Sequence, residues 1–317
     1  MKPYQVTAII TCFFPKEQDL ARLVDSIKDQ VSHLIIINNG GLEHTFIPAS
    51  PASPSNEKLI ILEPKANLGT AGGYNLGAKK AWDLGSTHIL LLDQDSECHR
   101  NMVAELLELE SYLISQGKAV AVVGPYYLCK SNNQVAPFIQ HEGYRIRRIY
   151  ETSPEVISFI SENTPQSPKK FVSCSYLISS GSLISKASWM AIKETNEGLF
   201  LDFTDIEWGL RATHLNYECF GSFNAKMFHL IGDDQISVLG RKISLHSPLR
   251  HYYAFRNCVW LFQQDYVAFS TRVNYLVKLI PKLMIYSLFS NQPWKQIKFM
   301  LLGIFHGLLN KMGRYDG

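Results

Sequence analysis

The chain has 317 residues, of which 46% are hydrophobic and 19% are charged. This composition supplies a sizeable core and excludes a globally disordered chain, a collagen-like chain and a coiled-coil rod. The formal net charge of +3 is too small to indicate a nucleic-acid-binding protein, so no nucleic-acid partner is expected.

The cysteines and the apolar runs indicate a compartment. The two closest cysteines, Cys98 and Cys129, are too far apart for a CxxC or zinc motif, so we expect buried thiols in a reducing environment. No signal peptide precedes the first strand-like segment, and no charge-free apolar run reaches the ~20 residues of a spanning helix. A cytoplasmic protein is therefore expected.

The first sixty residues predict strands alternating with a helix. A buried strand is expected over 6–14, and a helix follows Pro15, with apolar residues at Leu20, Leu23, Val24 and Ile27. A second strand over 33–37 ends at Asn38 and Asn39. The proline- and serine-rich segment 42–57 is expected to be a loop, followed by a short strand over 59–62.

The same alternation continues to residue 123. A glycine-rich turn from Asn67 to Gly73 leads into a helix that ends near Leu84. A strand over 88–92, a helix over about 99–116 and a strand over about 119–123 follow. This order predicts an α/β fold with a mostly parallel sheet flanked by helices, and ligands bind at the carboxyl ends of such strands.

Three regions are expected along the chain. Residues 1–250 would form the main domain, with one half over about 1–125 and another over about 171–250. The polar stretch 130–170 reads as an insertion or a mobile region. Residues 251–317 are aromatic, basic and helical in pattern, and would form a C-terminal extension.

Asp93, Gln94 and Asp95 directly follow an apolar strand. Two carboxylates at positions i and i+2 of a strand end can converge on Mg²⁺ or Mn²⁺, which prefer oxygen ligands and often share them with phosphates. An Asx-turn or a helix cap is the alternative interpretation.

The glycine-rich segment 67–77 enters a helix. Glycines let backbone N–H groups approach a phosphate, and a helix N-terminus favours an anion. A plain turn with close helix–sheet packing at Gly77 is the alternative. The segment is neither a dinucleotide fingerprint, which would follow the first strand, nor a Walker motif.

The segment 200–211 carries three carboxylates and a tryptophan within seven residues. On a helix that begins near Thr204, Asp205 would lie in the first turn and share a face with Trp208. Asp205 could then act as a general base. Capping of the helix by Asp202 and Asp205 is the alternative. His229 follows an apolar-leaning segment and is either a structural histidine or a ligand.

Taken in order, these motifs resemble the family 2 glycosyltransferases, which are inverting enzymes with the GT-A fold. The resemblance covers about residues 4–260 and is closest to bacterial rhamnosyltransferases of surface-polysaccharide (O-antigen or capsule) biosynthesis, with galactofuranosyltransferases as near relatives. It rests on Thr11, Asn38–Asn39, 67–75, Asp93–Asp95, 180–185, 200–211 and His229.

The resemblance implies a role for each motif. Thr11, Asn38 and Asn39 would line the pocket for the base and ribose, and Asn67, Gly69 and Asn75 would shape the donor pocket, with Gln94 beside them. The family often has Asp where this chain has Asn38, so recognition of the base departs from the family pattern there.

The resemblance also implies the reacting groups. Asp93 and Asp95, completed by His229, would hold Mn²⁺ or Mg²⁺ on the donor diphosphate. Asp205 would be the catalytic base. Trp208 would border the acceptor sugar, with Asp202 and Glu207 also counted among the acceptor-binding residues.

The expected activity is inverting, metal-assisted transfer of L-rhamnose from dTDP-L-rhamnose to a hydroxyl of a growing, lipid-linked polysaccharide. UDP-galactofuranose is the alternative donor. A nucleotidyltransferase would need a glycine-rich basic signature after the first strand, which is missing. A non-catalytic carbohydrate-binding relative would have lost Asp93, Asp95 or Asp205, and all three are present.

Residues 266–317 hold seven basic residues and one acidic residue, interleaved with apolar and aromatic side chains. Such helices can lie in the headgroup plane of a membrane. We therefore expect peripheral contact with the inner face of the cytoplasmic membrane. Packing on the catalytic domain or a contact in a homo-oligomer is the alternative.

Overall fold

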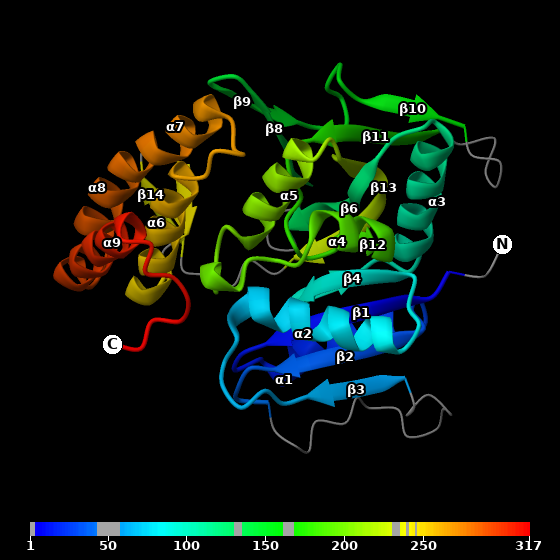
Figure 1. The fold of residues 1–317 in the computed structure, drawn as a ribbon, viewed down its shortest axis with the longest axis horizontal. Helices are drawn as coiled ribbons and strands as arrows, with labels where there is room; N and C mark the ends of the chain where they lie inside the picture. The colour runs from blue at the N-terminus through cyan, green and yellow to red at the C-terminus, as the bar shows by residue number, and fades with distance from the viewer. Residues whose placement is uncertain are drawn as a thin grey trace.

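A mixed sheet of eleven strands runs through the protein (Figure 1). The computed structural model describes residues 4–42, 58–129, 135–160, 168–229, 235–238, 241–244 and 246–317. The main path of the sheet has the spatial order β10-β11-β13-β6-β12-β4-β1-β2-β3. The α/β fold predicted from the alternation of elements is therefore confirmed.

The first half of the sheet is parallel, and it contains the strand ends at which the candidate site residues were predicted. Its strands pair in the order β4-β1-β2-β3. They are β1 (Val6–Cys12), β2 (His33–Asn38), β3 (Leu59–Leu62) and β4 (His88–Asp93). β1 ends two residues earlier than predicted, because Phe14 takes the left-handed backbone region with a φ of 45°.

Helices cover both faces of this half. They are α1 (Glu17–Ile27) and α2 (Gly69–Asp83), whereas α3 (Met102–Ser115) packs on the other half of the sheet. Leu20, Leu23, Val24 and Ile27 of α1 are buried on one face of the sheet, as their spacing predicts. Tyr74 and Ala78 of α2 pack on the other face. α3 begins later than predicted because Ser96–Cys98 forms a strand, β5, paired with β13.

The second half of the sheet is mixed, because β12 runs antiparallel to both β4 and β6. Its strands are β6 (Val120–Cys129), β7 (Val135–Ala136), β10 (Ile157–Phe159), β11 (Lys169–Cys174), β12 (Leu183–Ser185) and β13 (Glu218–His229). The short elements α4 (Lys186–Ile192) and η2 (Glu197–Leu199) precede α5 (Thr204–His214).

Part of the stretch 130–170, expected to be an insertion or mobile, forms regular strands. β8 (Phe138–Glu142) and β9 (Arg145–Ile149) make a hairpin. The hairpin reaches the C-terminal helices, where Asn274 donates a hydrogen bond to the carbonyl oxygen of Tyr144 (2.7 Å). A second hairpin joins β14 (Gln235–Val238) and β15 (Arg241–Ser244). Most of the predicted loop 42–57 lies outside the described residues.

The C-terminal region is helical, as predicted. It contains α6 (Pro248–Phe262), α7 (Phe269–Val277), α8 (Leu279–Phe289) and α9 (Pro293–Leu308). A Cβ atom on Gly303 or Gly307 would lie 2.5 Å or 2.6 Å from a carbonyl oxygen of α6. α6 and α9 therefore touch at their backbones. In the described ranges, no helix combines the length and the apolarity needed to cross a membrane.

We predict that Gly303→Ala destabilises the protein. Alanine normally favours a helix over glycine by about 1 kcal/mol, but here the added Cβ would lie 2.5 Å from the carbonyl oxygen of Tyr252. Overpacking of this kind costs about 1–3 kcal/mol, which a shift in the denaturant midpoint will report. Leu301→Ala, on the exposed side of α9, is the matched control and should change the midpoint little.

Candidate active site

The carboxyl ends of β1, β2 and β4 meet at one edge of the parallel sheet. In the register of the strands, Thr11 lies between Ile37 and Asp93, and Cys12 lies opposite Asn38. Each of these strand ends follows a buried apolar run. The polar groups predicted to meet here do lie on neighbouring strands.

Asp93 is held in place from two sides. The hydroxyl of Tyr74 on α2 donates to its carboxylate (3.0 Å), and its own N–H donates to the hydroxyl of Ser180 (3.0 Å). Ser180 is buried and also shares a hydrogen bond with Ser96 (2.8 Å). Burial, followed by the charge of Asp93, keeps the pKa of Tyr74 well above its usual range. Tyr74 therefore remains a hydrogen-bond donor that orients Asp93.

Gln94 links the Asp93–Asp95 segment to the end of β1. Its side-chain oxygen accepts from the N–H of Phe13 (2.8 Å), and its amide nitrogen donates to the Phe13 carbonyl oxygen (3.3 Å). The Gln94 amide therefore orients the strand ends. The Phe13 ring itself is 53% exposed beside this edge.

The residues expected to hold a metal lie at strand ends: Asp93 ends β4, Asp95 directly precedes β5, and His229 ends β13. His229 belongs to β13, where its backbone pairs with Ser96, the residue that follows Asp95. The side chain of His229 lies outside the described residues. Across the parts of the chain that the structure describes, no three His, Cys, Asp or Glu side chains form a ready metal cluster. The chemistry of the donor set fits a divalent cation, because Asp93 and Asp95 supply hard carboxylate oxygens.

The N–H groups of the glycine-rich segment donate hydrogen bonds to other parts of the protein. At the start of α2, the N–H of Leu68 donates to the side-chain oxygen of Asn39 (3.0 Å), and the N–H of Gly69 donates to the side-chain oxygen of Asn67 (2.7 Å). The N–H of Thr70 donates to the carbonyl oxygen of Phe200 (2.8 Å). The expectation that these N–H groups approach a phosphate is wrong in this structure, because protein oxygens already accept their hydrogen bonds.

Close packing explains three of the glycines in this segment. A Cβ on Gly69 would lie 2.2 Å from the carbonyl oxygen of Phe200, and Gly69 has a φ of 67°. A Cβ on Gly73 would lie 2.7 Å from Thr11, and one on Gly77 would lie 2.4 Å from Ile9. The packing alternative therefore holds at Gly77 and extends to Gly73, and it brings α2 onto β1.

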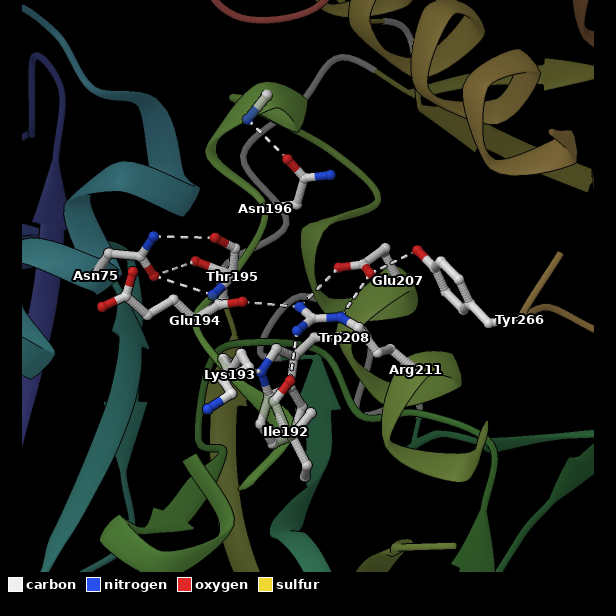
Figure 2. Close-up of polar contacts among 11 residues, drawn as sticks. Asn75, Ile192, Lys193, Glu194, Thr195, Asn196, Glu207, Trp208, Arg211 and Tyr266 are labelled. Carbon is white, nitrogen blue, oxygen red and sulfur yellow. Dashed lines mark hydrogen bonds and ion pairs between the residues drawn. The ribbon is translucent and has the colours of Figure 1, made fainter. Parts of the chain in front are cut away.

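The remaining asparagines also have partners in the protein. The side-chain oxygen of Asn38 accepts from the N–H groups of Gly40 (3.1 Å) and Leu42 (3.3 Å), which shapes the turn after β2. Asn75 is buried and exchanges hydrogen bonds with Thr195 (2.6–3.0 Å), as Figure 2 shows. Asn75 therefore joins α2 to the segment before η2, and it has no side-chain nitrogen facing an open donor site.

The loop 199–203 adopts an unusual backbone and carries the acidic motif. Phe200, Asp202 and Phe203 have φ values of 62°, 56° and 65°, a region that non-glycine residues seldom occupy. Such residues cost about 1–3 kcal/mol each unless the surroundings hold them. The buried side chain of Asn257 on α6 donates to three carbonyl oxygens of this loop, those of Leu199 (2.9 Å), Leu201 (2.7 Å) and Asp202 (2.9 Å).

Arg256 reinforces the same loop. Its buried guanidinium donates to the carbonyl oxygens of Gly198 (2.9 Å) and Leu199 (3.0 Å). It also donates to the carbonyl oxygen of Gly313, near the chain end. The C-terminal region is therefore part of the framework of the acidic motif.

Asp205 lies in the first turn of α5 and is half-buried. Its carboxylate accepts the N–H of Ile206 (2.8 Å). Burial, opposed by the Ile206 N–H and assisted by repulsion from Asp93 and Asp202, raises the pKa of Asp205 from 3.8 to about 6. The N-cap position is Phe203, whose side chain makes no capping bond. Asp202 therefore does not cap α5, and Asp205 is suited to take up a proton near neutral pH.

Trp208 and Glu207 are interior residues, contrary to their expected role at the acceptor. The Trp208 indole is 4% exposed, stacks with Trp189 and donates to the carbonyl oxygen of Lys193 (2.8 Å). The Glu207 carboxylate pairs with Arg211 (2.8 Å) and accepts from Tyr266 (2.7 Å) (Figure 2). Neither side chain presents a surface to an acceptor, because tertiary packing takes both faces of this helix.

Asp202 stays near the site. Its carboxylate lies 3.4 Å from Arg250 of α6, and its charge contributes to the raised pKa of Asp205. Four residues of the site were not predicted from the sequence: Tyr74, Ser180, Arg256 and Asn257. Only Tyr74 and Ser180 gave a local signal, since both lie inside motifs that were singled out.

The chain belongs to glycosyl transferase family 2, whose family model matches residues 8–185, more than half of the chain. It is a glycosyltransferase with the GT-A fold. Over 266 residues, 83% of this chain and 81% of the relative, it is 27% identical to the dTDP-rhamnosyl transferase RfbF of Shigella flexneri.

Solved structures share the fold at low identity. One is GalNAc-T7 with UDP, GalNAc and Mn²⁺, with a TM-score of 0.61 at 11% identity over 97% of this chain. This chain spans 56% of that protein. Another is S. aureus TarS 1-349 with UDP-GlcNAc, with a TM-score of 0.52 at 9% identity over 95% of this chain and 81% of that one.

We predict that Asn257→Ala lowers turnover and stability together. The change removes the donor shared by three carbonyl oxygens of the strained loop, and each unsatisfied buried group costs about 1–3 kcal/mol. Transferase assays and thermal unfolding will measure the losses. Asn274→Ala, at a partly exposed asparagine on α7 that bonds to one carbonyl oxygen, is the control. Equal activity in the two variants would contradict the role given to Asn257.

Proposed function

We propose that the protein transfers L-rhamnose from dTDP-L-rhamnose to a hydroxyl of a lipid-linked glycan, with inversion at the anomeric carbon. The observation that carries the proposal is the half-buried Asp205 in the first turn of α5, whose pKa is raised to about 6 chiefly by burial and then by repulsion from Asp93 and Asp202. The dTDP-rhamnosyl transferase of Shigella flexneri, 27% identical over most of both chains, supports the choice of donor.

The donor would lie over the carboxyl ends of β1, β2 and β4. Thr11, Asn38 and Asn39 border this edge on neighbouring strands. Phe13 and Phe14 follow β1 and are exposed, which gives a base a flat apolar surface to stack on. The side-chain oxygen of Asn39 accepts one internal hydrogen bond, from Leu68, which leaves it a lone pair for recognition of the base, whereas Gly40 and Leu42 use both lone pairs of the Asn38 oxygen.

The carboxylates of Asp93 and Asp95, with His229, would hold Mn²⁺ or Mg²⁺. GalNAc-T7 of the same fold was solved with Mn²⁺. When bound, such an ion neutralises the charge that develops on the departing diphosphate. Tyr74 and Ser180 would keep Asp93 oriented toward that position.

Asp205 would act as the general base. It takes the proton of an acceptor hydroxyl while that oxygen forms a bond to the anomeric carbon. The bond from that carbon to the diphosphate oxygen breaks on the opposite face, and its electron pair leaves with dTDP. One in-line displacement inverts the configuration and needs no covalent intermediate. Asp202 lies beside Asp205 and could accept a hydrogen bond from the acceptor.

A screen of sugar nucleotides by thermal shift tests the donor. A ligand that binds only the folded state raises its stability by RT ln(1 + [L]/Kd). We expect dTDP-L-rhamnose with Mn²⁺ to raise the melting temperature more than UDP-galactofuranose or dTDP-glucose. A larger shift with UDP-galactofuranose would identify a galactofuranosyltransferase. No shift with any donor, together with no transfer, would overturn the assignment.

We predict that turnover depends on a divalent cation and on Asp95. Without an ion, the donor diphosphate would face two carboxylates of like charge. Excess EDTA should abolish transfer, Mn²⁺ or Mg²⁺ should restore it, and Asp95→Ala should lower it at least 100-fold. Asp83→Ala, at an exposed carboxylate on α2, is the matched control. Full turnover in EDTA, or an Asp95→Ala variant as active as the wild type, is incompatible with the metal role.

We predict that Asp205→Asn lowers kcat by about 10²–10⁴-fold, the usual contribution of a general base, with donor affinity nearly unchanged. The base must be ionised, so wild-type kcat should fall as the pH drops below about 6, the raised pKa of Asp205. Steady-state kinetics across pH 5–8 and calorimetry of donor binding provide the measurements. Loss of donor binding in Asp205→Asn would indicate a structural role instead.

The same substitution should stabilise the fold at pH 7. The folded pKa of Asp205 is raised from 3.8 to about 6, so the folded state binds more protons than the unfolded state between these values. The contribution of Asp205 to the free energy of unfolding is therefore fully present below about pH 4, and it is lost as the pH rises through about 6. Asp205→Asn should be more stable than wild type at pH 7, by up to about 3 kcal/mol, and equally stable near pH 3.5.

A further inference from the structure

The C-terminal helices expose an unusual amount of apolar surface. Eleven of the large hydrophobic side chains exposed in the described residues come from the segment 269–309. In Figure 1, α8 and α9 lie at the left edge of the molecule, away from the eleven-stranded sheet. Patches of this kind mark sites of interaction when polar residues surround them.

The exposed side chains follow helical spacing. On α9 they are Trp294, Lys298, Leu301, Phe305 and Leu308, which repeat every three or four residues along one face. Trp294 is 82% exposed and Phe305 is 57% exposed. The other face of α9 carries Met300, Gly303 and Gly307, which are buried and pack toward α6.

α8 carries a second such face. Ile280, Met284 and Leu288 lie one turn apart and are exposed, whereas Leu279 and Tyr286 are buried. The two helices contact each other. We call the exposed faces of α8 and α9, with Trp294, the apolar stripe. Neither helix needs these side chains for its own packing.

The charged side chains of α8 and α9 all have the same sign. Lys282, Lys295 and Lys298 are exposed on the same two helices, and residues 266–315 include no Asp or Glu. A strongly basic surface that also displays tryptophan and aliphatic side chains matches the boundary between anionic headgroups and acyl chains.

We propose that the apolar stripe docks the protein on an anionic lipid bilayer, with α8 and α9 lying in the headgroup plane. Trp294 would lie at the interface, the aliphatic side chains would enter the acyl boundary, and the lysines would contact lipid phosphates. This proposal does not depend on which sugar nucleotide is the donor.

A second copy of the chain fits the apolar stripe less well than an anionic bilayer does. A two-fold interface would place the same surface on both sides, so Lys282, Lys295 and Lys298 would face the lysines of the other copy. No carboxylate on residues 266–315 would offset that repulsion. An anionic bilayer instead supplies the opposite charge.

Flotation of the full-length chain with liposomes tests the proposal. We expect the wild type to float with vesicles of phosphatidylcholine and 30% phosphatidylglycerol at low salt, to float less at 0.5 M NaCl, where charges are screened, and to stay down with phosphatidylcholine alone. Each lysine near an anionic surface contributes about fivefold to binding. Lys295→Gln with Lys298→Gln should therefore weaken partitioning about 25-fold.

Two further variants separate a specific surface from general stickiness. Leu301→Glu with Phe305→Glu should abolish flotation, whereas Ile114→Glu, at an exposed apolar residue of α3, should leave it intact. Donor hydrolysis without acceptor should be equal in all three proteins, which shows that they are folded. The proposal is overturned if the wild type does not float with anionic vesicles. It is also overturned if the wild type sediments as a dimer that Leu301→Glu with Phe305→Glu dissociates.

Discussion

The backbone of residues 199–203 is the constraint on which the active site depends. Three of its residues occupy the left-handed region, and α5 with Asp205 begins directly after them. Two parts of the protein hold this shape: Thr70 at the start of α2 binds the carbonyl oxygen of Phe200, and Asn257 on α6 binds the next carbonyl oxygens. The parallel half of the sheet, Asp205 and the C-terminal helices are therefore joined at one loop.

In this arrangement the glycine- and asparagine-rich motif has a structural role. Asn39, Asn67 and Gly69 organise the start of α2, and Asn75 fixes α2 to Thr195. Their hydrogen bonds set the distance between the strand ends and α5. In the proposed mechanism, recognition of the donor diphosphate then depends on the divalent cation that Asp93 and Asp95 would hold, because protein oxygens already accept the N–H groups at the helix N-terminus.

Those parts of the fold and the site that follow from local sequence patterns could be predicted from the sequence. The spacing of Leu20, Leu23, Val24 and Ile27 gives the buried face of α1, and an apolar strand before Asp93 places that carboxylate at a strand end. The asparagine roles could not be predicted, since an amide has the same donors and acceptors whether it binds a ligand or a neighbouring helix. Trp208 was misplaced because its partner Trp189 lies on another helix. Asn257 is far along the chain from the carbonyl oxygens it binds, and no local pattern marks it.

The chain end is fastened close to this loop. The N–H of Gly313 donates to the carbonyl oxygen of Gly198 (2.7 Å), its own carbonyl accepts from Arg256, and the N–H of Tyr315 donates to the Tyr253 hydroxyl (2.8 Å). A purification tag fused after Gly317 would begin beside the residues that shape the loop. Figure 1 shows the start of β1, the first strand, on the opposite side of the molecule. Fusions for expression or immobilisation therefore belong at the N-terminus.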